Sequence, residues 1–328
     1  MNYKFSNYSA YALYRLPFAD EIKVVCQCEE GGQSDGRQFV MIPFDETRHD
    51  TVSIRHDVEM TISTAMLSVE PADGEVHLDS GEEEYSQAFS RFHSSIPSDF
   101  PKLVLSRCSS AQYGGDPLEA FFRACQAYPR TMVYLCYTEK TGYWIGSTPE
   151  ILIAGSKSHY RTVALAGTMT HEGEWTEKNR SEQLIVAEYI RNIITPLSTV
   201  VEEEGPYTSR AGNLYHLKTE FHFSPIPSVK VIDLVRKLHP TPAVCGLPKD
   251  EAKAFIISNE GYDRKYYSGV VGMLDPHGET NLYVNLRCCN IHDGIATLYA
   301  GGGILPESTA ESEYAETQAK MKTILDIL

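Results

Sequence analysis

The sequence predicts an α+β fold built on largely antiparallel sheets. Strand-like and helix-like segments are mixed along the 328 residues, but they do not follow the regular strand–helix–strand rhythm of a doubly wound parallel sheet. In addition, residues 281–289 (NLYVNLRCC) alternate aliphatic with polar or aromatic side chains, so the two sets of side chains should face opposite ways along a strand.

The first half of the chain gives short strands and one clear helix. Residues 1 to about 95 carry alternating runs such as ALYRLP and FVMIPF, which predict strands in an irregular front portion. From residue 117, PLEAFFRACQAY predicts a helix. Residues 131–137 (TMVYLCY) predict a buried strand that is followed by the turn EKTG.

Two further helices are predicted in the second half. One runs from Thr176, a plausible N-cap, to Ile194, with Pro196 just past its end. The other begins near Thr309 and runs to the C-terminus. Its helical periodicity places a polar stripe beside the core-facing one, which indicates either a cleft wall or a solvated face with an ordinary i,i+4 ion pair. The core-facing stripe is Tyr314, Thr317, Met321, Ile324 and Leu328; the polar stripe is Glu313, Glu316 and Lys320.

The chain has no evident linker between domains. The stretches 31–37 (GGQSDGR) and 79–85 (DSGEEEY) are typical of surface loops, and neither has the extended low complexity of a hinge. We therefore expect one domain over 1–328, with a variable front portion at 1–95 and a catalytic core at 95–328.

Composition restricts the partners and the location of the protein. Lys plus Arg total 29 and Asp plus Glu total 44, a net charge of −15, which is unsuited to binding nucleic acid or an anionic membrane. An anionic substrate would therefore need a locally cationic site or a metal. The eight cysteines lack paired CxxC spacing and are expected to be buried, reduced thiols. Neither a membrane span nor a signal peptide is predicted, so a cytoplasmic location is expected.

Two ionisable residues lie within apolar, strand-like segments. They are Lys102 in PKLVLSR and Glu150 in GSTPEIL. Partial desolvation in such segments can tune a base or an acid toward neutral pH. Read in isolation, such a pair is more often a lysine at a strand edge and an ordinary surface carboxylate.

The C-terminal half gives this pair its context. With Lys102 and Glu150, five segments agree in residue type, order and spacing with the chorismate-utilising enzymes, which include isochorismate, salicylate, anthranilate and aminodeoxychorismate synthases. The resemblance covers residues 95 to 328 and implies two packed antiparallel sheets with helices outside. The segments are ALAGT (164–168), LHPTPAVCGLP (238–248), YDRKYYSGVVG (262–272), YVNLRCC (283–289) and YAGGGILPES (299–308).

The resemblance implies the roles of base and acid. Members that add water to chorismate carry a lysine base at the position of Lys102, and ammonia-using relatives lack it. Glu150 corresponds to the acid that protonates the leaving 4-hydroxyl while water attacks C2. Lys102 would need to be neutral part of the time, and Glu150 would need to be protonated in the loaded site.

The resemblance also implies a Mg²⁺ site and a substrate site. Glu182 and Glu316 match the two metal-binding carboxylates, and Glu313 matches a third, water-mediated ligand. Asn179 departs from the usual Asp or Glu, which lowers the total ligand charge by one. The residues matching substrate contacts are Gly167, Thr168, His239, Ala243, Tyr267, Arg287, Gly301, Gly302 and Lys320. Without the resemblance, Arg287 would more often be a salt-bridged strand residue, and the GGG run would more often be a plain turn.

Among the family's activities, water addition is favoured. Ala166 stands where aminodeoxychorismate synthases carry an attacking lysine, and Lys102 argues against ammonia, so no glutamine amidotransferase partner is expected. The expected enzyme is an isomerase, an isochorismate synthase in the pathway of either menaquinone or a siderophore. Ala243 favours stopping at isochorismate, whereas Tyr267 leaves salicylate synthase open. A non-catalytic binder of a chorismate-like ligand is the remaining alternative.

Overall fold

The described strands form two antiparallel sheets. The structure is a computed structural model that describes residues 5, 7–29, 36–67, 69, 76–96, 98–156, 159–169, 171–211 and 214–328, without the side chains of Met66, Thr168 and Ala211. Within these ranges one sheet has nine strands, the other has eight, and every pair of neighbouring strands is antiparallel. The predicted α+β class with two packed antiparallel sheets is confirmed.

The nine-stranded sheet joins strands from the front portion of the chain to strands from the rest of it. In spatial order its strands are β13 (Gly246–Leu247), β6 (Lys102–Gln112), β17 (Ile295–Ile304), β16 (Cys288–His292), β8 (Gly142–Thr148), β7 (Met132–Thr138), β1 (Ala10–Arg15), β2 (Glu21–Gln27) and β5 (Val58–Ser63). The long pairing of β6 with β17 places Leu103 opposite Ile304.

The eight-stranded sheet contains the two longest strands. Its order is β11 (Ser198–Ala211), β12 (Leu214–Pro225), β10 (His159–Met169), β9 (Ile151–Ser156), β15 (Thr280–Val284), β14 (Val270–Leu274), β3 (Gln38–Ile42) and β4 (Val52–Arg55). Side chains from both sheets, among them Phe39, Tyr134, Trp144 and Tyr283, fill the core between the sheets. The two layers are thereby held by burial of large aromatic surface.

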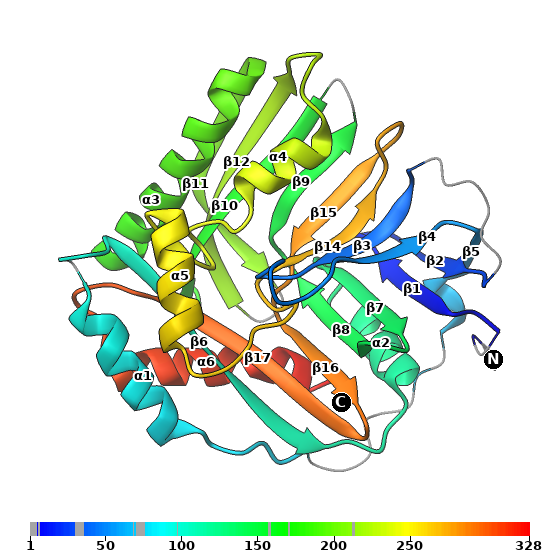
Figure 1. The fold of residues 1–328 in the computed structure, drawn as a ribbon, viewed down its shortest axis with the longest axis horizontal. Coiled ribbons are helices and arrows are strands. Elements are labelled where there is room, and N and C mark those ends of the chain that lie inside the picture. The colour runs from blue at the N-terminus through cyan, green and yellow to red at the C-terminus, as the bar shows by residue number, and fades with distance from the viewer. Residues whose placement is uncertain are drawn as a thin grey trace.

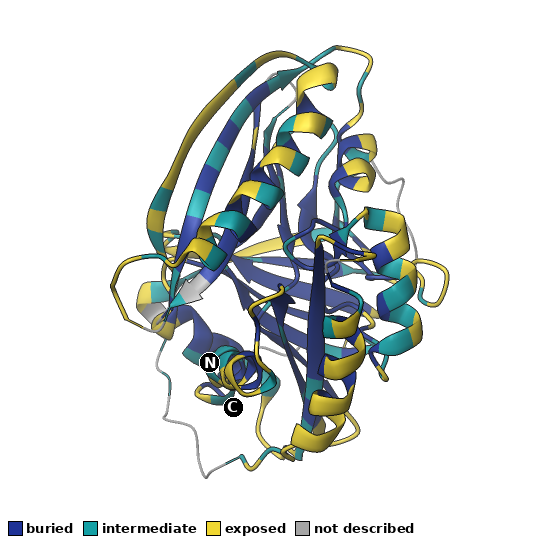
Figure 2. Ribbon diagram, turned by 90° about the vertical axis from the view of Figure 1, so that its left-hand side faces the viewer, coloured by how far each residue is buried: buried dark blue, intermediate teal, exposed yellow. Residues whose placement is uncertain are grey.

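Helices cover the outer faces of the sheets. Helices α3 (Glu177–Ile194) and α4 (Val231–Leu238) pack on the eight-stranded sheet, and the others pack on the nine-stranded sheet. Figure 1 shows α3 beside β10–β12, and α1, α5 and α6 around β6 and β17. The sheets are largely buried, and the helices are exposed on their outward sides (Figure 2). The remaining elements are α1 (Glu82–Ser94), α2 (Pro117–Ala127), α5 (Lys249–Asn259), α6 (Ala310–Leu325) and the short 3₁₀ turns Thr64–Met66 and Thr195–Leu197.

The predicted helix starts are confirmed by their caps. The Thr176 side chain accepts a hydrogen bond from Asn179 N at the start of α3, and the Thr309 side chain accepts one from Ser312 N at the start of α6. Asp116 caps α2 in the same way. Helix α6 ends at Leu325, three residues before the end of the chain, and its predicted core-facing stripe is buried.

The prediction of one continuous strand over 281–289 is wrong. Strand β15 ends at Val284 in the eight-stranded sheet, and β16 begins at Cys288 in the nine-stranded sheet. Between them the chain crosses from one layer to the other, and Arg287 takes a left-handed backbone conformation with φ of 47°. The alternation is local to each strand, so it could not indicate that the two halves belong to different layers.

Two expectations drawn from composition can also be compared with the structure. All eight cysteines are free thiols; six are buried, while Cys28 and Cys108 are partly exposed. Within the described ranges, every helix is either too short or too polar to span a bilayer.

Candidate active site

A small cavity lies where the two sheets diverge. Its walls come from β6 and β17 of one sheet, β10 and β12 of the other, the turn before β9, and helices α3 and α6. Its volume is about 70 Å³. Ligand pockets are typically about 300–1,000 Å³, so a ring-sized ligand requires these walls to separate. Ten of the fourteen predicted site residues line it: Glu150, Gly167, Glu182, Ala243, Tyr267, Arg287, Gly301, Gly302, Glu316 and Lys320.

Glu150 is held in the turn between β8 and β9. Its carbonyl oxygen accepts a hydrogen bond from Val284 N, and the Thr148 hydroxyl donates to Val284 O, so the turn is tied to β15. The side chain is 2% exposed, and its Oε1 has no hydrogen-bond partner among the described residues. Burial raises the pKa of Glu150 to about 8, although the positive charges of Lys102 and Lys320 act in the opposite direction. The carboxyl is therefore protonated at neutral pH.

Lys102 begins β6 and is fully buried. Its Nζ lies 2.9 Å from Oε1 of Glu182 on α3. The contact is an ion pair without hydrogen-bond geometry, because Nζ has no hydrogen-bond partner among the described residues. Burial alone would raise the pKa of Glu182, but the charge of Lys102 outweighs it and the pKa is lowered. In this state Lys102 is held against Glu182 and is not among the residues that line the cavity.

The other two predicted metal ligands are also paired with lysines. Glu313 is buried on α6 and forms a short ion pair with Lys178 of α3. Glu316, one turn further along α6, lies 2.7 Å from Lys320, and that lysine also donates to Gly301 O at 2.7 Å. The polar stripe of α6 is therefore a cleft wall, and it contains the i,i+4 pair as well.

The glycine run on β17 makes room for these carboxylates. A Cβ added to Gly302 would lie 2.9 Å from Glu313 Oε2 and 3.5 Å from Glu316 Oε1. At Gly303 it would lie 2.3 Å from Glu182 Oε1 and 3.1 Å from Lys102 Cε. At Gly301 it would instead meet the Cβ of Ser106 and the backbone of β6. The run therefore has two roles, strand packing at Gly301 and a carboxylate-lined hollow at the next two residues.

Arg287 is oriented by a histidine that the sequence did not single out. Arg287 donates through Nη2 to His216 Nε2 at 2.7 Å, and His216 Nδ1 donates to Gly167 O at 2.8 Å. Burial, followed by the charge of Arg287, holds the pKa of His216 well below its usual range, so its ring is neutral and both nitrogens are committed. Burial lowers the pKa of Arg287 to about 10, and the guanidinium stays charged.

The remaining predicted contacts border the same cavity. Gly167 has φ of 71° and donates to Glu182 Oε2 at 3.3 Å, so a glycine is needed for the backbone to reach the carboxylate. Tyr267 is 2% exposed and stacks on Tyr299. Ala243 lines the wall opposite β10. The side chain of Thr168 lies outside the described part of the structure.

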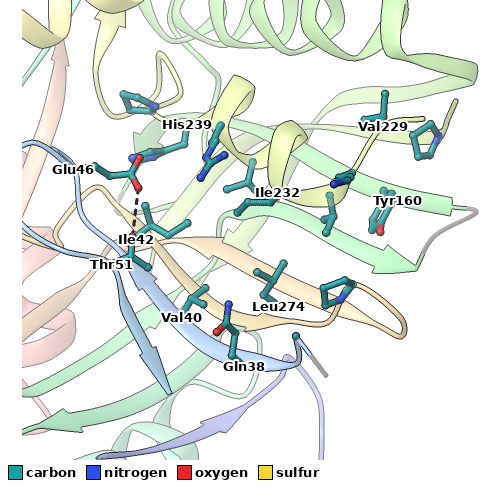
Figure 3. A pocket seen from close by; sticks show the side chains of 18 of the residues that line it. Gln38, Val40, Ile42, Glu46, Thr51, Tyr160, Val229, Ile232, His239 and Leu274 are labelled. Carbon is teal, nitrogen blue, oxygen red and sulfur yellow. Dashed lines mark hydrogen bonds between the residues drawn. The ribbon is translucent and has the colours of Figure 1, made fainter. Parts of the chain in front are cut away.

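The structure does not place His239 beside this cavity. His239 lines a second, much larger cavity of about 1520 Å³, between the outer face of β3 and β14 and helix α4 (Figure 3). Its Nε2 lies 3.2 Å from Pro43 O, and burial lowers its pKa to about 3. The expectation that His239 contacts the substrate therefore has no support in this geometry, since α4 ends at Leu238 and directs the following residue to the outer face of the sheet.

The donor set at Glu182, Glu313 and Glu316 fits a hard divalent cation in its chemistry. All three residues supply carboxylate oxygens, which Mg²⁺ prefers, and Glu313 Oε2 is buried without a hydrogen-bond partner among the described residues. No group of three His, Cys, Asp or Glu side chains within the described ranges is arranged to hold a metal ion as it stands. The ligands are present, but each is turned toward its own lysine.

Comparison with known proteins gives a consistent result. Residues 49–328 match the profile of the family described as chorismate binding enzyme. The salicylate biosynthesis isochorismate synthase of Pseudomonas aeruginosa is 30% identical over 243 residues, which are 70% of this chain and 51% of that protein. The chain spans about half the length of the curated relatives it matches.

Solved structures share the fold. The menaquinone-specific isochorismate synthase MenF of Escherichia coli superposes with a TM-score of 0.81 at 21% identity, over 97% of this chain and 89% of that one. Anthranilate synthase component I of Streptococcus pneumoniae gives 0.75 at 18% identity, over 90% and 82%. The architecture is thus common to proteins of different named activities, and the side chains must decide between them.

Proposed function

Since this chain belongs to the chorismate binding enzyme family, we propose that it is an isochorismate synthase. It would exchange the 4-hydroxyl of chorismate for a hydroxyl at C2, with a shift of the ring double bonds and no net change in composition. The observation that carries this proposal is geometric: the buried carboxyl of Glu150, whose pKa is raised by burial, lines one cavity together with Arg287 and Lys320, and Lys102 contacts Glu182 on the wall of the same cavity.

Glu150 would serve as the general acid. A hydroxide is a poor leaving group, so loss of the 4-hydroxyl requires that a proton be delivered to its oxygen as the bond breaks. A carboxyl that is protonated at neutral pH and has an oxygen without a partner among the described residues can supply that proton. The cations nearby then stabilise the carboxylate that remains.

Lys102 would serve as the base that takes a proton from the attacking water. Its Nζ lies 2.9 Å from Glu182 Oε1, so this contact must open before the nitrogen can reach a water molecule in the cavity.

Arg287 and Lys320 would hold the carboxylates of the substrate. Arg287 presents a planar fork whose orientation is fixed by His216, and Lys320 adds a point charge from α6. Glu182, Glu316 and Glu313 would hold Mg²⁺, and when bound this ion supplies positive charge for a substrate carboxylate.

Product analysis tests the proposal. The full chain is incubated with chorismate and Mg²⁺, and the products are resolved by chromatography. Isochorismate as the single product supports an isochorismate synthase. Salicylate together with pyruvate would make the protein a salicylate synthase, and unchanged chorismate would make it a binder.

A further inference from the structure

The candidate metal site contains three acidic and three basic side chains, and they are matched one to one. Lys102 pairs with Glu182, Lys178 with Glu313, and Lys320 with Glu316. The six charges cancel, so the cluster as a whole does not attract a cation. Each carboxylate is also turned toward its lysine, and no three acidic side chains of the described ranges form a metal-ready group.

The three lysines differ in what else they contact. Lys320 lines the cavity and donates to Gly301 O, and Lys102 is completely buried beside Gly303. Lys178 is not among the residues that line the cavity, and its side chain is 21% exposed. Lys320 is 17% exposed but lines the cavity, and Lys102 is fully buried, so Lys178 is the partly exposed lysine of the three that lies outside the cavity lining.

Glu313 is poised to exchange partners. Its side chain is 1% exposed, one oxygen faces Lys178, and the other oxygen has no hydrogen-bond partner among the described residues. That free oxygen lies beside Gly302, on the side where Glu316 also approaches. A buried carboxylate that has one oxygen without a partner is energetically costly unless a second cation binds to that oxygen.

We propose that Lys178 is a built-in competitor for the divalent cation, and that its ammonium must leave Glu313 before the metal site assembles. This inference rests on the Mg²⁺ requirement of the proposed function. The neighbouring Asn179 is uncharged, and the side chain that neutralises Glu313 is Lys178. Lys178 thereby sets the concentration of Mg²⁺ at which the site fills.

The test measures metal binding without substrate. Metal-stripped full-length protein is titrated with Mg²⁺ by calorimetry, for the native chain and for Lys178→Met. The variant should bind Mg²⁺ at least about tenfold more tightly, because it no longer breaks an ion pair on binding. Lys178→Arg keeps the charge and should bind like the native chain. Lys140→Met removes an exposed lysine that pairs with Asp50 and should also change nothing.

Two further measurements separate competition from other causes. The tenfold difference should persist at about 0.5 M KCl, since buried pairs are screened far less than exposed charges. Without metal, Lys178→Met should melt at a lower temperature than the native chain because Glu313 is left unpaired, and saturating Mg²⁺ should raise its melting temperature by more than it raises that of the native chain. Lys178→Gln provides the same test if the methionine variant does not fold.

Equal or weaker Mg²⁺ binding by Lys178→Met would overturn the proposal, as would a difference that disappears in high salt. Failure of both proteins to bind Mg²⁺ would overturn it as well. None of these outcomes depends on turnover. Production of isochorismate is scored separately, so failure of this inference can be distinguished from failure of the proposed function.

Discussion

The smaller of the two cavities, rather than the larger one, is lined by the buried ionisable side chains that are typical of an active site. The large one, of about 1520 Å³, is lined by aliphatic residues of β3, β14 and α4 together with prolines and with charged side chains that are exposed or half-buried (Figure 3). The small one, of about 70 Å³, is lined by carboxylates, a lysine and an arginine, several of them buried. The difference teaches that ionisable groups desolvated together identify a site better than empty volume does.

The largest expected effect separates the two cavities by activity. Lys102→Ala and Glu150→Gln should each reduce isochorismate formation by about 10³-fold or more, because each removes a proton-transfer group. Ile232→Ala, which changes the wall of the large cavity, is the matched control and should keep native activity. Product formation is measured by chromatography and folding by thermal melting. Turnover at the native rate in either site variant would remove that residue from its role.

The pH dependence of stability sharpens the comparison within the small cavity. The pKa of Glu150 rises to about 8 in the folded chain from its ordinary 4.5, so folding favours its protonated form. This contribution to stability is complete below about pH 4.5 and is lost as pH rises through about 8. The side chain of Glu150→Gln stays neutral, so the free energy of unfolding of this variant should increase relative to that of the native chain across that pH window. The difference should be on the order of a few kcal/mol at about pH 9. Urea unfolding of the metal-free proteins at several pH values measures this difference in free energy of unfolding. A difference that does not change with pH would contradict the raised pKa of Glu150.

A smaller effect is expected at His216. Replacing it with phenylalanine removes the acceptor that orients Arg287, so KM for chorismate should rise about tenfold while kcat changes less. His216→Asn retains an acceptor and should recover part of the loss. Steady-state kinetics gives the split between the two constants. A loss confined to kcat would show that His216 acts on the reacting atoms instead.

The smallest effect is expected in the large cavity. His239→Gln can still contact Pro43 O, and its side chain does not border the small cavity. Activity should stay within about twofold of the native chain at every pH from about 6 to 9, because the histidine is already neutral there. A tenfold or greater loss of activity in His239→Gln would show that His239 does contribute to the active site.

The sequence predicted local structure from neighbouring residues, and its resemblance to a family indicated ten of the residues that line the small cavity, but neither revealed the partners that those residues contact. The caps of α3 and α6 and the buried stripe of α6 follow from nearest neighbours on a helix, so they could be found without the fold. His216 could not, because a histidine within a strand carries no signal until Arg287 is brought against it from the other layer. Lys178 was likewise hidden, since its partner lies 135 residues away.

The crossing between the two sheets has a consequence for engineering this protein. Arg287 combines a left-handed backbone with a guanidinium that burial destabilises, two features that the fold alone would avoid. A selection for thermostable variants should therefore yield glycine or asparagine at this position, and we expect the selected variants to have low activity. A screen of variants of this chain should therefore select for turnover as well as for thermal stability.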